Sequence, residues 1–399
     1  MKKIVFFCIP AHGHTNPTLE VVKELVSRGH QVWYYSYNSM REKIESAGAT
    51  FVSCDDYDMN RKLTARDSAR MGKDLAFSTK VLVDTTLALD DKVLKEMAQL
   101  KPDCIVADSM ALWGKAVALK LGIPFVSSTT TFAFNRYSAK IMKQSLGELW
   151  KMILSVPKTS KQVKRLRDKG YPVKNILDII GSDENTHTIV YTSPQFQPFA
   201  DTFSDKYVFV GPSIRPATET IKKTGEKLIY ISMGTVNNDQ MPFYKTCIDA
   251  FRNTAYQVIL SVGNLVSLKD FGELPENISV FPQVDQIAVL KQADVFLSHC
   301  GMNSVSESLY FKVPLVMLPQ TTEQKGVARR VLELGAGIIP TRQDGATLLD
   351  AVNTIFRDST YQKNAEKIAE GFLNASGAKG AADKIIGLTE FMAMDSADI

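Results

Sequence analysis

The chain has 399 residues, of which 45% are hydrophobic and 23% are charged, and its formal net charge is +4. This composition is typical of a folded globular protein and argues against a disordered chain. The near balance of 47 basic and 43 acidic residues gives no support to nucleic-acid binding. The length exceeds what one ordinary hydrophobic core holds, so we expect two domains.

Cysteine usage and the apolar segments indicate where the protein works. The five cysteines are scattered without CxxC spacing, which favours a reducing compartment over a disulfide framework. The apolar run at residues 4–11 lacks a cleavage pattern of small residues, so a buried strand explains it better than a signal peptide. No stretch approaches the ~18 apolar residues that cross a bilayer. We therefore expect a cytoplasmic protein without a membrane partner.

The first half of the chain alternates strands with helices. Asn16 is a plausible N-cap, with Pro17 at the first helical position. A strand, a helix and a second strand in succession predict a parallel sheet. The strands are expected at residues 3–9, 31–35, 103–107, 124–127, 188–192 and 207–210.

A polar stretch at residues 213–226 separates this half from a second alternating series. Strands are expected there at residues 227–232, 257–262, 278–282, 294–298 and 315–319. The pattern predicts an α/β protein of two doubly wound parallel-sheet domains, 1–212 and 227–399, and the final helix could pack back on the first domain. Open α/β sheets bind ligands beyond the carboxyl ends of their strands, so chemistry is expected in those loops.

Two histidines, His12 and His14, follow the first predicted strand. They could cap the helix or pack locally, which is the ordinary role of an isolated histidine. Asp108 holds the equivalent position after another strand of the same domain. A His–Asp pair there could act as a general base with an orienting carboxylate, taking a proton from an acceptor hydroxyl. Spacing alone leaves both interpretations open.

A second polar cluster, Ser298–Ser304, lies between a strand and a helix of the second domain. Gly301 permits close backbone approach, while Asn303 and Ser304 place side-chain donors beside the free N–H groups of a helix start. Such a terminus favours a diphosphate; the alternative is an ordinary helix cap. The segment Ser232–Thr235 ends another strand of this domain and could meet the same phosphates.

Metal and dinucleotide signatures find little support. The chain has no G-x-G-x-x-G after a strand and no G-x-x-x-x-G-K-[ST]. His299 and Cys300 are adjacent without a second ligand pair, which argues against zinc. Asp56-Tyr57-Asp58 could hold a divalent ion on a diphosphate, but such a triplet arises readily by chance and lies in the other domain. We expect no bound metal.

Several of these segments together resemble a known family. Phe281–Gln283, His299–Ser304 with Glu307, and Pro319–Gln324 resemble the donor signature of glycosyltransferase family 1, the UDP-glycosyltransferase superfamily. The segment His12–Pro17 is similar to its bacterial macrolide/flavonoid branch. The order of the motifs extends the resemblance over essentially the whole chain. It implies the GT-B fold, two Rossmann-like domains facing a deep interdomain cleft, and transfer that inverts the anomeric centre without a metal.

The resemblance also implies a role for each matching residue. His14, three residues before Pro17, matches the catalytic base and Asp108 its partner, which leaves a structural role for His12. The resemblance implies that the pyrophosphate is bound by His299, Gly301, Asn303 and Ser304, with Ser232 and Thr235 assisting. It implies that Glu307 contacts the ribose and that Gln283 and the Phe281 backbone contact the nucleoside. The sugar hydroxyls would be held by Glu323 and Gln324.

One position departs from the family pattern. Many relatives carry a tryptophan three residues before the glutamine, where its ring stacks on uracil; here that residue is Val280. Phe281 is adjacent, but successive residues of a strand face opposite sides of the sheet. The base-stacking residue is therefore unidentified, and the choice between uridine and thymidine donors stays open.

The acceptor is expected to meet the first domain. Large apolar side chains there are more often core than pocket, but a methionine-rich wall would suit polyphenols or macrolides. The candidate wall residues are Met59, Met71, Phe77, Met110, Trp113, Phe132, Phe134 and Tyr137.

The leading prediction is an inverting, metal-independent hexosyltransferase that uses a UDP-sugar co-substrate, UDP-glucose first, and glycosylates a flavonoid, another phenol or a macrolide. One alternative is a nucleotide-sugar epimerase on the same fold, which would not need the pair of His14 and Asp108. The other is a non-catalytic nucleotide-sugar sensor. No permanently bound cofactor is expected, and a monomer is the default oligomeric state.

Overall fold

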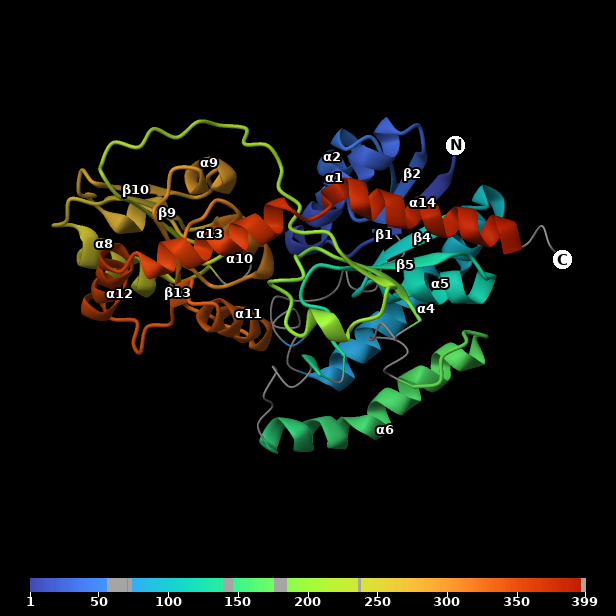
Figure 1. Ribbon diagram of the computed structural model, residues 1–399. Helices are drawn as coiled ribbons and strands as arrows, with labels where there is room; N and C mark the ends of the chain where they lie inside the picture. The colour runs from blue at the N-terminus through green and yellow to red at the C-terminus, as the bar shows by residue number, and fades with distance from the viewer. Residues whose placement is uncertain are drawn as a thin grey trace. The chain divides into compact units, whose positions relative to one another are not determined.

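The computed structural model (Figure 1) describes residues 1–55, 70, 74–135, 137–138, 146–175, 185–235 and 238–395. The chain divides into two compact units, Met1–Ser213 with Ser376–Ile399, and Ile214–Ala375. Each unit is built on a parallel sheet covered by helices, which confirms the predicted class of two Rossmann-like domains. No helix in these ranges is long and apolar enough to cross a membrane.

The first unit has a seven-stranded sheet in the order β3-β2-β1-β4-β5-β6-β7, and every pairing is parallel. Its strands are β1 (Lys3–Phe7), β2 (Gln31–Ser36), β3 (Thr50–Ser53), β4 (Cys104–Asp108), β5 (Phe125–Thr129), β6 (His187–Val190) and β7 (Tyr207–Phe209). All five residues of β4 are buried. Continuous burial of this kind is expected when helices cover both faces of a sheet.

Helices complete the first unit, including one from the end of the chain. They are α1 (His12–Ser27), α2 (Arg41–Ser46), α4 (Leu75–Leu100), α5 (Leu112–Leu121), α6 (Leu146–Asp168) and α14 (Gly377–Asp395), with short turns η1 (Asn38–Met40) and η4 (Ala200–Thr202). Helix α14, red in Figure 1, packs against α1, where Arg28 pairs with Asp383 at 2.6 Å. The last helix therefore belongs to the first unit, the placement that the sequence left open for it.

Helix α1 begins earlier than the sequence predicts. It starts at His12 with Ala11 as its N-cap, and Ala11 O accepts from His14 N at 3.0 Å and from Thr15 N at 2.9 Å. Pro17 lies inside the helix, so the predicted cap at Asn16 is wrong. Proline removes only its own backbone donor, and this early in the helix the turn forms around it. His14 consequently stands on the first helical turn and not in a loop.

The second unit has a six-stranded parallel sheet in the order β10-β9-β8-β11-β12-β13. Its strands are β8 (Leu228–Ser232), β9 (Gln257–Ser261), β10 (Ile278–Phe281), β11 (Val295–Ser298), β12 (Leu315–Met317) and β13 (Gly337–Ile338). Its helices are α8 (Met241–Phe251), η5 (Leu268–Phe271), α9 (Gln286–Leu290), α10 (Met302–Tyr310), α11 (Thr322–Glu333), α12 (Gly345–Arg357) and α13 (Thr360–Leu373). Residues 210–227, which include the predicted linker 213–226, contain no helix or strand.

The strand orders locate one switch point in each sheet, where successive connections leave in opposite directions. In the first unit this point lies between β1 and β4, and in the second it lies between β8 and β11. Ligands of open α/β sheets bind beyond the carboxyl ends of the strands at such points. Each polar cluster singled out in the sequence follows a strand that borders a switch point.

A glycine in α5 tests how tightly the first unit is packed there. A Cβ on Gly114 would lie 2.6 Å from Ala107 Cβ and 2.8 Å from Phe7 Cβ. We expect Gly114→Ala to lower the free energy of unfolding by about 1–3 kcal/mol, because overpacking displaces β1 or β4. The control Gly387→Ala in α14 meets no heavy atom within 4 Å and should stabilise by about 0.5–1 kcal/mol. Denaturant unfolding of both variants measures this; equal effects would contradict it.

Candidate functional site

The first unit brings His14 and Asp108 together. Asp108 is the last residue of β4, and its Oδ1 lies 2.8 Å from Nδ1 of His14. The carboxylate side chain is 0% exposed and the imidazole 27% exposed, so the ring is the water-facing member of the pair. The backbone N–H of Met110 donates to Asp108 Oδ2 at 3.2 Å, and Thr130 Oγ1 lies 3.3 Å from the same imidazole nitrogen.

This geometry sets the tautomer of His14. A carboxylate can only accept, so the short contact at Nδ1 requires that this nitrogen carry the proton. The other ring nitrogen, Nε2, is then left with a lone pair. A partly exposed imidazole that is protonated on Nδ1 and backed by a buried carboxylate is the arrangement of a general base acting through Nε2.

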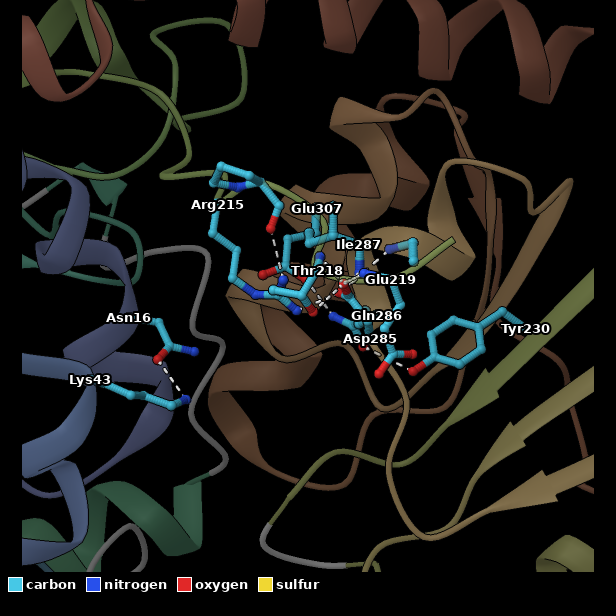
Figure 2. Close-up of polar contacts among 12 residues, drawn as sticks. Asn16, Lys43, Arg215, Thr218, Glu219, Tyr230, Asp285, Gln286, Ile287 and Glu307 are labelled. Carbon is cyan, nitrogen blue, oxygen red and sulfur yellow. Dashed lines mark hydrogen bonds and ion pairs between the residues drawn. The ribbon is translucent and has the colours of Figure 1, made fainter. Parts of the chain in front are cut away.

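His12 has a different environment, although it is only two residues away. Lys43 Nζ lies 3.3 Å from its Nδ1 and donates to Asn16 Oδ1 at 3.3 Å (Figure 2). Burial and the Lys43 charge lower the pKa of His12. Lys43 thus connects the first turns of α1 to α2, which suits the structural role expected of this histidine.

The predicted acceptor wall is only partly supported. Trp113 and Phe132 are buried in the core, so they offer no side-chain surface to an acceptor, and this part of the prediction is wrong. Phe134 and Tyr137 are exposed, and Phe77 lies under the Arg70 guanidinium at 4.2 Å from the ring centroid. Met110 is partly exposed and bonded to Asp108. Met59, Met71 and the Asp56–Asp58 triplet lie outside the described residues.

In the second unit, the last residues of four neighbouring strands lie in register, and three of them are serines. Ser298, Ser232, Ser261 and Phe281 are register neighbours across β11, β8, β9 and β10. The three serines of this row have short polar side chains. Thr235, just beyond β8, is exposed.

The turn between β11 and α10 is built for close approach. Cys300 takes a positive φ of 66°, a costly conformation for a residue with a Cβ, and its N–H donates to Ser298 Oγ at 3.1 Å. Gly301 is the N-cap of α10 and makes no side-chain cap bond. The first N–H groups of α10, at Met302 to Ser304, are therefore directed at the space where an anion would be favoured.

The His299 ring lies between two glycines. A Cβ on Gly234 would lie 2.6 Å from His299 Nε2, and a Cβ on Gly301 would lie 2.7 Å from the same atom. Burial lowers the pKa of His299 to about 4, against a smaller opposing effect of the Ser232 backbone. His299 is consequently neutral at pH 7. A neutral ring can meet a diphosphate only through its one N–H, as a hydrogen-bond donor, and not through a positive charge.

Residues expected to contact the nucleoside lie on β10 and α10. Val280 packs against the hydrophobic core, whereas the Phe281 side chain is 42% exposed, as strand alternation predicts. The Phe281 carbonyl already accepts from Val262 N at 3.0 Å. Gln283 is exposed. Glu307 in α10 accepts a hydrogen bond from Gln286 Nε2 at 2.5 Å.

The pair expected to hold the sugar hydroxyls lies in the first turn of α11. Glu323 is exposed. The Gln324 side-chain oxygen accepts from Gln320 N at 2.8 Å and Thr321 N at 3.1 Å, forming a capping box with Thr321. Its oxygen is thereby occupied, so only its NH₂ group can contact a sugar. The spacing of Thr321 and Gln324 in the sequence is that of a capping box, and it could have predicted this helix start.

The predicted residues thus gather into two clusters, one in each unit. His14 and Asp108 meet in the first, and the candidate diphosphate residues of β8, β11 and α10 meet in the second. Sequence reasoning missed Thr130, which contacts His14, and Gln286, which donates to Glu307. Within the described ranges, no group of three or more His, Cys, Asp or Glu side chains could hold a metal.

Comparisons with known proteins identify the family. Residues 246–388 match the family "Erythromycin biosynthesis protein CIII-like, C-terminal domain". The NDP-glycosyltransferase YjiC of Bacillus licheniformis is 34% identical over 96% of this chain and 97% of its own length. The uncharacterised UDP-glucosyltransferase YojK of Bacillus subtilis is 32% identical, with 97% of each chain covered. The crystal structure of the kitacinnamycin glycotransferase is 27% identical with a TM-score of 0.83, covering 97% of this chain and 98% of that one.

The chain therefore belongs to glycosyltransferase family 1, the UDP-glycosyltransferase superfamily, in its macrolide-type branch, and it is a glycosyltransferase. The GT-B class implied by the sequence is confirmed by the same structural likeness.

The low pKa of His299 has a consequence for stability. Between its ordinary value of 6.5 and about 4, the unfolded chain binds a proton that the folded chain does not. The free energy of unfolding must therefore fall as the pH drops through this window and be insensitive to His299 above it. Relative to His299→Gln, we expect the wild type to lose about 2 kcal/mol between pH 7 and pH 5. Denaturant unfolding at both pH values measures this, and a constant difference would contradict it.

Proposed function

We propose that this protein is an inverting glycosyltransferase that moves a hexose from a nucleotide sugar to a hydroxyl of a small apolar acceptor, with His14 as its base. The observation that carries the proposal is the 2.8 Å contact between His14 and the buried Asp108. It leaves a basic imidazole nitrogen at the switch point of the first sheet. An epimerase would not require this pair, and the relatives above bear glycosyltransferase names.

The proposed chemistry is a single displacement. His14 Nε2 takes the proton of the acceptor hydroxyl while that oxygen forms a bond to the anomeric carbon of the sugar. The bond from this carbon to the diphosphate oxygen breaks in the same step, and the configuration inverts. Asp108 holds the tautomer and stabilises the imidazolium that forms.

The second unit stabilises the departing nucleoside diphosphate in this proposal. Negative charge develops on the leaving oxygen, and the N–H groups at the start of α10 are fixed donors aimed at an anion. His299 adds a neutral ring donor, and Asn303, Ser304, Ser232 and Thr235 are the proposed polar contacts around them. Fixed dipoles of this kind need no metal, so we propose a metal-independent reaction.

The proposed donor is a UDP-hexose, with UDP-glucose first. The name UDP-glucosyltransferase attached to YojK supports this choice. Glu307 is the proposed acceptor for the ribose hydroxyls. Gln283 and the Phe281 backbone are the proposed contacts of the base, and Glu323 with the Gln324 amide are those of the sugar.

The proposed acceptor is a phenol, flavonoid or macrolide. Met110 beside Asp108 and the exposed Phe134 and Tyr137 offer apolar contacts in the first unit. The match to a family named for erythromycin biosynthesis and the kitacinnamycin enzyme support a natural product as acceptor.

The direct test is turnover. The protein is incubated with UDP-glucose, TDP-glucose or UDP-N-acetylglucosamine and a panel of phenols and macrolides, with chelator present, and product masses are followed. We expect addition of one hexose from UDP-glucose, undiminished by chelator. Asp108→Asn should lower kcat by about 10²–10⁴-fold because the wrong tautomer is held, with donor binding unchanged.

Lys43→Ala serves as the matched control, because it disturbs His12 at the same helix start and leaves His14 and Asp108 in place. It should retain most of the activity. Free release of glucose without acceptor glycosylation, or full activity in Asp108→Asn, would contradict the proposal.

A further inference from the structure

Asp285, which lies between β10 and α9, binds the first residues of the second unit. The carboxylate is 2% exposed, and its Oδ1 accepts from Arg215 Nη2 at 2.5 Å. Its Oδ2 accepts from Thr218 N at 2.5 Å, Thr218 Oγ1 at 2.9 Å and Glu219 N at 3.2 Å (Figure 2). Burial opposes ionisation, but the bonds from Arg215 and Thr218 outweigh it and hold the pKa of Asp285 well below its usual range.

The same carboxylate also fixes helix α9. Asp285 is the N-cap of that helix, and its Oδ1 accepts from Ile287 N at 3.1 Å and Ala288 N at 3.5 Å. One buried side chain therefore binds both the segment 215–219 and the first turn of α9. Gln286, the first residue of α9, takes its position from this cap.

Gln286 in turn connects to Glu307. Its Nε2 donates to Glu307 Oε2 at 2.5 Å, and its Oε1 accepts from the Tyr230 hydroxyl at 3.3 Å. Tyr230 is buried in β8 and stacks on Phe296 with ring centroids 4.6 Å apart, so its hydroxyl is a fixed donor. Both ends of the carboxamide are thus held, which fixes the direction of the Glu307 carboxylate.

We infer that Gln286 is a positioning residue for donor recognition, and that Arg215 and Asp285 hold it in place. This inference rests on the proposed function, in which Glu307 accepts from the ribose hydroxyls of a nucleoside diphosphate. Gln286 occupies one carboxylate oxygen of Glu307 and presents the other to the ribose. The segment 215–219 is by this route part of the support of the donor site.

The chemistry of an amide suits this position. Burial raises the pKa of Glu307, and the hydrogen bond from Gln286 and the Arg215 charge oppose that rise. Two ribose hydroxyls need an ionised carboxylate to accept from, since a protonated acid offers a donor where an acceptor is required. The neutral NH₂ group of Gln286 favours the ionised form of Glu307. Unlike a cation, it does not compete with the ribose hydroxyls for the carboxylate.

The test compares the binding of UDP and 2′-deoxy-UDP by calorimetry, without acceptor. We expect Gln286→Leu to raise the Kd of UDP about 10-fold, the range expected for a hydrogen bond to a charged group. The penalty for removing the 2′-hydroxyl should shrink at least about 3-fold in this variant, because the carboxylate is no longer directed at the ribose. A purely structural role would weaken both nucleotides equally.

The supporting role inferred for Arg215 can be tested against a matched control, Lys223. Arg215 and Lys223 lie in the same segment of the second unit, and each forms an ion pair with an aspartate. Arg215 pairs with Asp285 at 2.5 Å, and Lys223 pairs with Asp294 at 2.6 Å. Asp294 precedes β11 at the opposite end of the sheet from Ser298. Arg215→Ala should raise the Kd of UDP several-fold and reduce the 2′-hydroxyl penalty, whereas Lys223→Ala should leave both at wild-type values.

Other outcomes separate this inference from the proposed function. Wild-type binding of UDP with an unchanged 2′-hydroxyl penalty in Gln286→Leu and Arg215→Ala would overturn the inference while leaving glycosyl transfer intact. UDP binding without any turnover would overturn the function alone. If melting curves show that Gln286→Leu does not fold, Gln286→Asn replaces it: its amide falls about 1.5 Å short of Glu307, and a wild-type penalty there would equally overturn the inference.

Discussion

The polar cluster of the first unit depends on one buried carboxylate, that of Asp108. The Asp108 carboxylate is removed from water at the end of a fully buried strand, where an unpaired charge would cost several kcal/mol. The Met110 N–H and the His14 imidazole are what meet it. The first sheet brings them within reach because β1 and β4 are neighbours with parallel direction, so the segments that follow both strands emerge at one edge. Because water is excluded around Asp108, an unpaired carboxylate there would be costly, and its hydrogen bond to the imidazole is strong for the same reason.

The second unit solves a different electrostatic problem with neutral groups. A row of serines, the start of α10 and an uncharged His299 form a surface of dipoles and not of cations. Such a surface favours an anion without a bound counter-charge that would have to be displaced before product release. Apart from these groups, the ion pair of Asp285 with Arg215 holds the start of α9.

Much of this could be predicted from the sequence. Apolar runs bounded by turn residues predicted nearly all of the longer strands, and most candidate residues lie at the carboxyl ends of these strands or in the loops and helices that follow. Shorter elements such as β3 and β13 lack that signal. The start of α1 was misplaced because Pro17 was read as a boundary, although the turn forms around it. Trp113 and Phe132 could not be sorted from pocket residues, because aromatic side chains serve both roles and only packing distinguishes them. The link from Arg215 through Gln286 to Glu307 joins residues 21 to 70 positions apart, and no local pattern records such contacts.

The tautomer of His14 is the most direct measure of the central claim. Nitrogen-15 NMR of the histidine side chains, assigned with a His14→Gln variant, reports which ring nitrogen carries the proton near neutral pH. The contact with Asp108 predicts that the wild-type imidazole carries its proton on Nδ1 and not on Nε2. In Asp108→Asn, the preference for the Nδ1 tautomer should be lost. An imidazole protonated on Nε2, or one whose tautomer ignores residue 108, would contradict it.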